Sequence, residues 1–348
     1  MKRFAAGVVV AAVAMLTACA PTPAAGPEPS AGSSASAVEH QARPGAAPSS
    51  PSPQRSSTLG PTAAQPSGWL AAVSGDNGRL AILGDSFASG EGAGGYRPAG
   101  EARKDSCHRS RYAVASELFA TENIANLACS RATTGHLAAP QQLAAVDPGS
   151  DPGAVPPQLD QLQGVDPTLV MMSLGGNNLD FAGILQACLL DTVPCTDDPQ
   201  LVLEATAQLS LLQPDLEAAY SSVADAVAAP VLVLPYPQLF DVPAGGCGRL
   251  SPTEQEFARQ LVGELNAVIR SAVEGVEQAN VYYVDAVEES LAGHGACSDD
   301  PYLHAANVSG LLQAADSATA NQELLHPTRE GYRAMTAAII NWAKDYPF

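Results

Sequence analysis

Residues 79–95 of the chain read RLAILGDSFASGEGAGG. Leu80 to Leu83 form an apolar run that leads directly into Gly84-Asp85-Ser86 and then into a glycine-rich loop. A serine at the carboxyl end of a buried parallel strand lies where open α/β sheets bind their ligands. Gly84 allows a sharp turn without a Cβ penalty, so the turn can present the Ser86 hydroxyl to a substrate. The triplet is also typical of ordinary turns, so Ser86 needs support from the rest of the chain.

Two other motifs are excluded. Residues 90–95, GEGAGG, fit the dinucleotide pattern G-x-G-x-x-G. They lie several residues past the strand, however, and lead into Tyr96-Arg97-Pro98 rather than into a helix. The pattern G-x-S-x-G does not occur in the chain, so an α/β-hydrolase nucleophile has no candidate.

The chain is predicted to alternate strands and helices. Apolar segments indicate strands at Leu80–Leu83, Asn123–Ala128, Thr168–Leu174, Val231–Leu234 and Val281–Asp285. Helices are predicted at Arg111–Thr121, at Val202–Ala228 with an interruption or a kink at Pro214, at Ser251–Gln278, and from Pro327 to near Lys344. Pro140–Pro157 is expected to lack regular structure. We therefore predict a three-layer α/β/α domain around a sheet of about five parallel strands.

The N-terminal residues predict export. A basic start is followed by an apolar run that is too short to span a membrane and is typical of a signal peptide. Leu16-Thr17-Ala18-Cys19 resembles the bacterial lipobox, in which Cys19 is acylated after cleavage; a plain secretory signal is the alternative. We predict a signal peptide at residues 1–18, a disordered Pro/Ala/Ser-rich tether at 19–68 and one domain at 69–348. The protein would then be lipid-anchored to the outer face of the bacterial cell membrane, or released from it.

The net charge and the cysteine count indicate which partners and which cross-links to expect. The net charge of −19, from 36 acidic and 17 basic residues, argues against nucleic acid as a partner. Six cysteines besides Cys19 in an exported chain indicate disulfides rather than zinc, and no metal is expected. Sequence alone leaves fifteen possible pairings, among which Cys188 with Cys195 closes the shortest loop.

Three motifs carry the residue types that an acyl-transfer site requires. Two follow predicted strands and one precedes a predicted helix. Ser86 follows the first strand, Gly175-Gly176-Asn177-Asn178 follows the third, and His326 precedes the last helix. A serine hydroxyl is a weak nucleophile until a base takes its proton, and the tetrahedral intermediate needs hydrogen-bond donors at its oxyanion. Each motif is weak alone, but the set in this order indicates a serine hydrolase.

With these residues the chain resembles the SGNH (GDSL) hydrolases, in particular the secreted bacterial esterase and lipase branch with three disulfides. The resemblance covers Leu80 to Met335 and implies a flavodoxin-like fold. It implies Ser86 as nucleophile, His326 as base and the Asn177 side chain as an oxyanion donor. It also implies disulfides paired in sequence order, namely Cys107–Cys129, Cys188–Cys195 and Cys247–Cys297.

Three positions depart from the family pattern. Arg131 replaces a glycine of the second block; it still offers its backbone N–H to the oxyanion, but it is strained if the position requires positive φ. Glu323 replaces the aspartate before the histidine, and either its side chain or a main-chain carbonyl is expected to orient His326. Asn178 replaces an aspartate, with no mechanistic consequence that we can derive.

The predicted function is an exported serine esterase or lipase that needs no cofactor, acts as a monomer and hydrolyses a lipid or an acylated glycan. Two alternatives remain open. One is transfer of the acyl group to an envelope glycan. The other is a catalytically silent envelope-binding lipoprotein. The loops at residues 93–104, 140–157 and 181–196 are expected to set substrate choice.

Overall fold

The computed structural model describes residues 65–97, 107–143, 153–190, 194–241, 250–304 and 322–346. These ranges belong to one compact unit, Leu59–Phe348. The predicted signal peptide, the predicted lipidation site Cys19 and the tether up to residue 64 lie outside the described residues, so they stay predictions. No helix in the described ranges is both long and apolar enough to cross a bilayer.

The main sheet has five parallel strands in the order β2-β1-β5-β6-β7. The strands are β1 (Leu80–Gly84), β2 (Ile124–Asn126), β5 (Leu169–Ser173), β6 (Val231–Val233) and β7 (Val281–Tyr283). Counted along the sheet, this is the 2-1-3-4-5 order of flavodoxin-like folds. Every residue of β1, β5 and β6 is buried, as expected for strands covered on both faces. The predicted fold class is confirmed.

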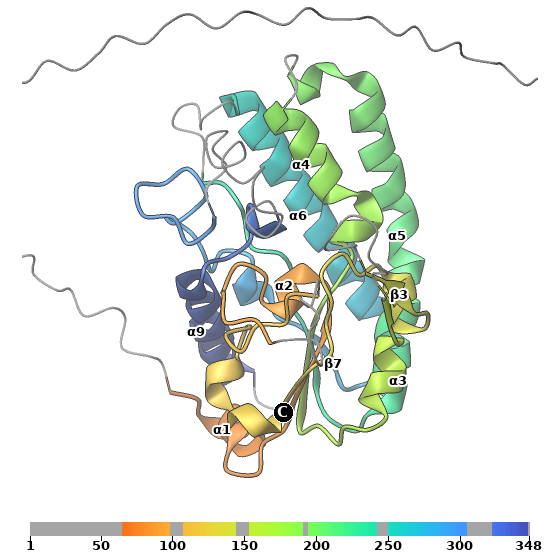
Figure 1. Cartoon of the computed structure of the whole chain (residues 1–348), viewed down its shortest axis with the longest axis vertical. Coiled ribbons are helices and arrows are strands. Elements are labelled where there is room, and N and C mark those ends of the chain that lie inside the picture. Colours follow the sequence, from red (N-terminus) through yellow and green to blue (C-terminus); the bar gives the residue numbers. More distant parts are fainter. Residues whose placement is uncertain are drawn as a thin grey trace, which may run out of the picture. The chain divides into compact units, whose positions relative to one another are not determined.

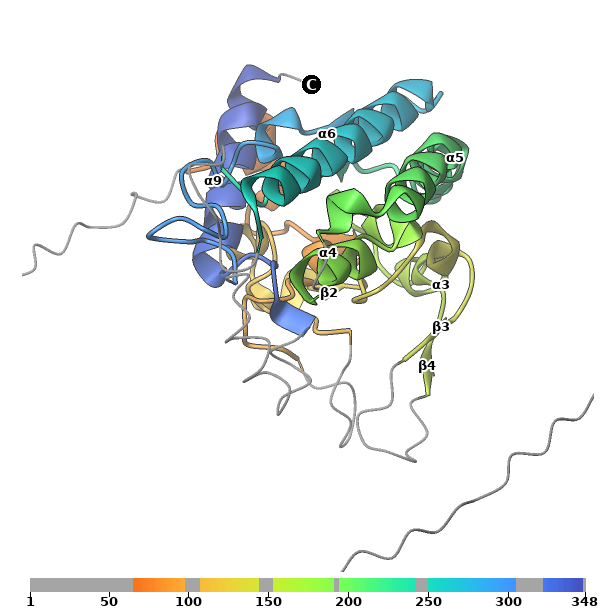
Figure 2. The same ribbon diagram turned by 90° about the horizontal axis from the view of Figure 1, so that it is seen from above.

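Helices lie on both sides of the sheet. They are α1 (Gly68–Ser74), α2 (Ser86–Ser89), α3 (Gln158–Leu162), α4 (Phe181–Leu190), α5 (Pro199–Ala226), α6 (Pro252–Gly275) and α9 (Arg329–Asp345). Figure 1 shows α1 and α9 on one side of the strands and α3 and α5 on the other, and the view from above separates α9 from α3 and α5 in the same way (Figure 2). Short 3-10 turns occupy Ser116–Leu118, Thr121–Asn123, Thr134–Leu137, Gly176–Leu179, Cys195–Asp197 and Asp285–Val287.

The two longest helices of the described residues, α5 and α6, match the predicted bounds closely. Ser251 caps α6 by accepting from the Glu254 N–H, while the Glu254 carboxylate accepts from the Ser251 N–H. The helix α5 continues through Pro214 rather than ending there. Both helices therefore begin and end within a few residues of the predicted bounds.

The helix predicted at Arg111–Thr121 was wrong. This segment contains turns and the 3-10 turn Ser116–Leu118 instead. Residues 113–116 are buried in succession, so no solvent-facing stripe exists for an amphipathic helix. Ala115 has a φ of 57°, and its N–H donates to Thr336 Oγ1 of α9 over 2.9 Å. Contact with α9 therefore overrides the helical periodicity.

Two segments that were expected to be loops contain regular structure. Gln141–Gln142 (β3) and Ala154–Val155 (β4) form a short antiparallel pair, and residues 181–190 form α4. Ile184 and Leu185 of α4 are buried in the core. Burial of an apolar face thus ordered a stretch that had been expected as a loop.

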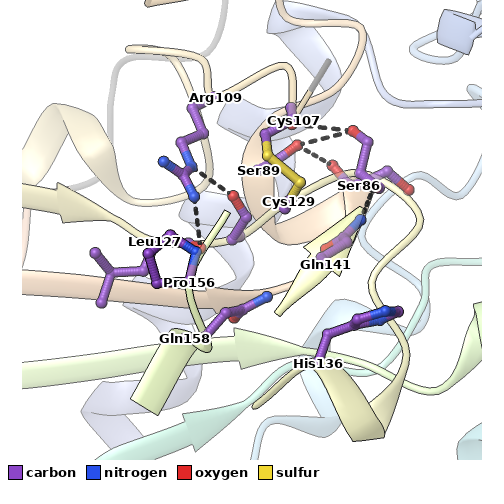
Figure 3. The surroundings of a disulfide bond; sticks show 12 residues. Ser86, Ser89, Cys107, Arg109, Leu127, Cys129, His136, Gln141, Pro156 and Gln158 are labelled. Atoms are coloured by element: carbon purple, nitrogen blue, oxygen red, sulfur yellow. Dashed lines mark hydrogen bonds between the residues drawn. A yellow bond between two sulfur atoms is a disulfide. The ribbon is translucent and has the colours of Figure 1, made fainter. Parts of the chain in front are cut away.

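Two of the predicted disulfides are present, Cys107–Cys129 and Cys188–Cys195. The first joins the segment after the glycine-rich loop to the loop that follows β2 (Figure 3). The Arg109 guanidinium supports the same loop by donating to the carbonyls of Leu127 and Ala128. Cys247 lies outside the described residues, so its pairing with Cys297 stays a prediction.

Candidate active site

The site lies at the carboxyl edge of β1 and β5, where the strand order reverses. In open α/β sheets this switch point is the crevice in which ligands bind. Ser86 is the first residue of α2, directly after β1, and Asn177 lies in the turn directly after β5. His326 precedes α9 and reaches the same edge from the last part of the chain.

Ser86 and His326 are hydrogen-bonded. The distance from His326 Nε2 to Ser86 Oγ is 2.8 Å. On the other side of the ring, Nδ1 lies 3.1 Å from the Leu324 carbonyl oxygen, which accepts its proton when Nε2 acts on the serine. The Phe87 ring lies 5.0 Å from the imidazole, centroid to centroid, and limits its movement. The predicted nucleophile, the predicted base and a carbonyl that can orient the base are thus in contact.

Glu323 does not contact the imidazole. Its carboxylate accepts a hydrogen bond from the Tyr96 hydroxyl, which in turn accepts from the Gly92 N–H. Of the two groups expected to orient His326, the main-chain carbonyl of Leu324 is the one in place. The placement of Glu323 among the catalytic residues is therefore corrected. Through Tyr96, this side chain links the segment just before His326 to the glycine-rich loop.

Burial and nearby negative charge shift the pKa of His326 in opposite directions. Removal of water from around His326 lowers the pKa of its imidazole below the usual value, because burial disfavours the charged form. The Glu91 charge and the Leu324 carbonyl oppose this shift in pKa. The ring is therefore held mainly in the neutral form that can accept a proton.

Three groups are the predicted donors to a developing oxyanion: the Asn177 amide and the backbone N–H groups of Ser86 and Arg131. The Asn177 amide is oriented by a 3.0 Å hydrogen bond from Nδ2 to the Ala132 carbonyl, which uses one of its two protons. The backbone N–H groups of Ser86 and Arg131 donate to no other atom of the described residues. The role of these three groups as oxyanion donors stays a prediction.

Arg131 has a φ of 69°, in the left-handed region. This is the conformation that a glycine adopts without strain, which explains why a glycine is expected in the second block. The Cys107–Cys129 disulfide and the bond from Ser130 N–H to the Cys107 carbonyl hold the loop in this conformation. The arginine therefore keeps the geometry of the loop at a conformational cost of about 1–2 kcal/mol.

Asn178 joins the two loops that carry the predicted oxyanion donors Asn177 and Arg131. Its Oδ1 accepts from the Thr134 N–H over 3.1 Å, and its Nδ2 donates to Thr134 Oγ1 over 2.8 Å. The sequence pattern gave this residue no role. The two hydrogen bonds fix the spacing between the turn after β5 and the loop after β2.

The turn at Gly84 is forced by the neighbouring strand. Gly84 has a φ of 120°, and a Cβ added there would lie 2.0 Å from the Ser173 carbonyl oxygen of β5. The buried Gln158 side chain satisfies both the N–H and the carbonyl of Gly84. Close approach of β1 to β5 therefore requires glycine immediately before the Asp85-Ser86 pair.

Tyr236 connects the nucleophile turn to the oxyanion turn, and sequence reasoning missed it. Its hydroxyl donates to Asp85 Oδ2 and accepts from the Gly176 N–H over 2.9 Å. Its own backbone is held on both sides by the Asn266 amide. Burial raises the pKa of Asp85 to about 7, against the opposing effect of the Tyr236 hydrogen bond. The only local signal was a tyrosine following the fourth predicted strand.

A second buried carboxylate organises the glycine-rich loop. Glu91 is fully buried; its Oε1 contacts His108 Nδ1, and its Oε2 accepts from Ser130 and Gln322. A buried carboxylate is stable only when its oxygens are hydrogen-bonded. Glu91 therefore fixes the glycine-rich loop against the second loop and against the segment that leads to His326.

The described residues hold one group of possible metal ligands, Cys188, Cys195 and Glu254. The two sulfurs are joined in a disulfide, and a disulfide offers no thiolate to a metal. This group does not form a metal site in the oxidised protein.

Comparison with known proteins places this geometry in a family. The model of the GDSL-like lipase/acylhydrolase family matches residues 82–334. The chain belongs to that family. Lipase 1 of Streptomyces coelicolor is 28% identical over 267 residues, covering 75% of this chain and 85% of the relative. The lipase of Streptomyces rimosus is 29% identical over 273 residues, with the same coverage. Our chain is accordingly a carboxylic ester hydrolase of the GDSL type.

Two solved structures of Streptomyces enzymes have a fold similar to that of this chain. Phospholipase A1 from Streptomyces albidoflavus NA297 is 25% identical, with a TM-score of 0.57 over 76% of this chain and 98% of that one. The extracellular lipase from S. rimosus is 24% identical, with a TM-score of 0.56 over 77% and 98% of the two chains. The GDSL sheet and its helices are therefore shared with these enzymes.

Replacement of Arg131 tests the strained loop. The Arg131→Gly variant should be more stable than Arg131→Ala by about 1 kcal/mol, because only glycine relieves the left-handed strain. Both variants keep the backbone N–H and should keep ester hydrolysis. Thermal and urea unfolding of the pair measure the difference; equal stabilities would contradict the strain.

The Glu323→Gln variant tests the corrected assignment. A side-chain amide can still accept from Tyr96, and His326 keeps its Leu324 carbonyl, so turnover should fall by less than about tenfold, or roughly 1.4 kcal/mol. In a serine protease, the loss of an orienting aspartate costs roughly 10⁴-fold. A loss of that size in a folded variant would restore Glu323 to the catalytic residues.

Replacement of Tyr236 tests the link between the two turns. Tyr236→Phe leaves the Gly176 N–H without its acceptor and Asp85 Oδ2 without its donor, so kcat should fall by about tenfold or more with little change in KM. Tyr220→Phe is the matched control, because the buried Tyr220 hydroxyl has no hydrogen-bond partner among the described residues. Equal kcat values for the two variants would rule out the positioning role.

Proposed function

We propose that this chain is an exported, lipid-anchored serine esterase or lipase that cleaves carboxylic esters through an acyl-enzyme on Ser86. The observation that carries the proposal is the 2.8 Å contact between Ser86 Oγ and His326 Nε2 at the switch point of the sheet. His326 takes the serine proton during attack and returns it to the leaving alcohol. Water then repeats the sequence on the acyl-enzyme and releases the acid.

The polar groups around the nucleophile support each charge that this reaction develops. The Asn177 amide and the N–H groups of Ser86 and Arg131 would stabilise the oxyanion of each tetrahedral intermediate. The Leu324 carbonyl, 3.1 Å from Nδ1, would stabilise the imidazolium. A neutral carbonyl stabilises this cation less than a carboxylate would, and the buried Glu91 charge contributes at longer range.

The catalytically silent alternative rested on two departures from the family pattern. Arg131 has the backbone conformation of the glycine that it replaces, and the Leu324 carbonyl occupies the orienting position that Glu323 leaves empty. Neither departure removes a catalytic atom. The geometry therefore favours an active hydrolase.

The names of similar proteins support lipid esters as the substrate class and export of the chain. Two relatives are named lipases, and one solved relative is a phospholipase A1. The S. rimosus structure is described as an extracellular lipase. We propose long-chain esters of lipids as the substrates, with anchoring through Cys19 as part of the same proposal.

The Ser86→Ala variant tests the nucleophile. It should abolish hydrolysis of aryl esters and labelling by a fluorophosphonate probe, while the thermal midpoint stays nearly unchanged because one partly accessible hydroxyl contributes little to folding. Ser222→Ala, at an exposed position on α5, is the matched control. Undiminished activity of the Ser86 variant would refute the assignment. Product analysis with water and with sugar acceptors separates hydrolysis from acyl transfer.

The pH dependence of kcat/KM tests the base. His326 must be neutral to accept the serine proton, and burial lowers its pKa below 6.5. Activity should therefore survive acidification through pH 6.5 and fall only at lower pH. A series of initial rates with an aryl ester gives the acid limb. A midpoint above 6.5 would mean that charge stabilisation outweighs burial.

A further inference from the structure

A cavity lies outside the catalytic site, between the turns of residues 111–121 and the first part of α9. Its volume is about 210 Å³. Three arginines line it, Arg111, Arg329 and Arg333, together with the Tyr112 ring and Glu117. We call this cavity the arginine pocket. Ser86, Asn177 and His326 do not line it.

The positive charge of the arginine pocket is only partly neutralised. Arg333 Nε lies 3.7 Å from the Glu117 carboxylate, and both side chains are about half exposed. Arg111 and Arg329 pair with no carboxylate of the described residues. In a chain with a net charge of −19, three of the 17 basic residues thus gather at one cavity. Like charges held together are costly unless an anion shares them.

The two unpaired guanidinium groups are held in position by one aromatic ring. Arg329 lies 3.7 Å and Arg111 5.0 Å from the centroid of Tyr112, within the range of cation–π contacts. The backbone N–H of Arg111 also donates to the Gly95 carbonyl. A Cβ at Gly95 would lie 2.6 Å from the Tyr112 ring, so the glycine-rich loop packs closely against it. The ring therefore limits the movement of both arginines before any ligand arrives.

We propose that the arginine pocket binds a phosphate group, carried either by a lipid headgroup or by a free phosphate ion. Guanidinium groups present planar pairs of donors that match phosphate oxygens, and two of them at one cavity can share the dianion. The carboxylate of Glu117 is the competing anion, because it holds Arg333 and repels the ligand. Phosphate binding and ester hydrolysis are separate properties, so this proposal stands or falls without the proposed function.

The pocket is connected to the catalytic loops. Arg329 follows His326 by three residues, and the Tyr332 hydroxyl, also at the pocket, donates to the Glu91 carbonyl of the glycine-rich loop. An anion bound there would hold α9 and the glycine-rich loop together. For a phosphate on a lipid headgroup, the same site would fix this face of the domain to an anionic surface.

Calorimetric titration of the full chain with inorganic phosphate is the first test. We expect a Kd of about 1 mM or tighter, weakened at least fivefold in Arg111→Gln and in Arg329→Gln. Glu117→Gln should bind more tightly than the unchanged chain, a gain that an unfolded variant could not produce. Arg79→Gln, which breaks the exposed pair with Asp166, is the matched control and should leave the Kd unchanged.

Vesicle sedimentation is the second test and distinguishes the sources. It uses the Ser86→Ala chain, to prevent hydrolysis, with phosphatidylcholine vesicles that contain or lack phosphatidic acid. Added binding to phosphatidic acid that is lost in Arg111→Gln and Arg329→Gln would identify a lipid phosphate. Calorimetric binding without this added sedimentation would identify free phosphate. No phosphate-dependent binding in either test, or binding that survives both arginine changes, would overturn the proposal.

Discussion

The parallel pairing of β1 with β5 is the constraint on which the site depends. These strands are neighbours in space, although the loops that leave them lie far apart in sequence, and β2 lies on the other side of β1. Their approach leaves no room for a side chain at Gly84, where a Cβ would meet the Ser173 carbonyl. The chain must turn there, and the turn delivers Ser86 next to the oxyanion loop after β5.

Buried and partly buried polar groups then hold the loops at this edge in one arrangement. Tyr236 joins Asp85 to the Gly176 N–H, Asn178 joins its turn to Thr134, and Glu91 joins the glycine-rich loop to Ser130. A buried polar group without a partner costs about 1–3 kcal/mol, so each link penalises any other loop arrangement. The loops therefore gain rigidity that loop sequences alone do not supply.

Backbone strain at the site has a similar explanation. Arg131 and Leu325 both have positive φ values, of 69° and 60°. Leu325 lies between the carbonyl that orients His326 and the histidine itself, and its N–H donates to the His304 carbonyl. Strained residues persist where the surroundings determine their conformation, and here both lie in loops that carry predicted site residues. The network of contacts around them offsets the cost.

The sequence by itself determined the parallel α/β fold and the strand positions, and it singled out Ser86, Asn177 and His326 as candidates, because strand periodicity and turn chemistry are local properties. It did not determine the segment at residues 111–121, where burial against α9 replaced a helix. Nor did it choose between Glu323 and a carbonyl as the partner of His326, or reveal Tyr236. Those outcomes depend on which atoms lie within about 3 Å after the loops pack, and contacts between residues distant in sequence leave no local pattern.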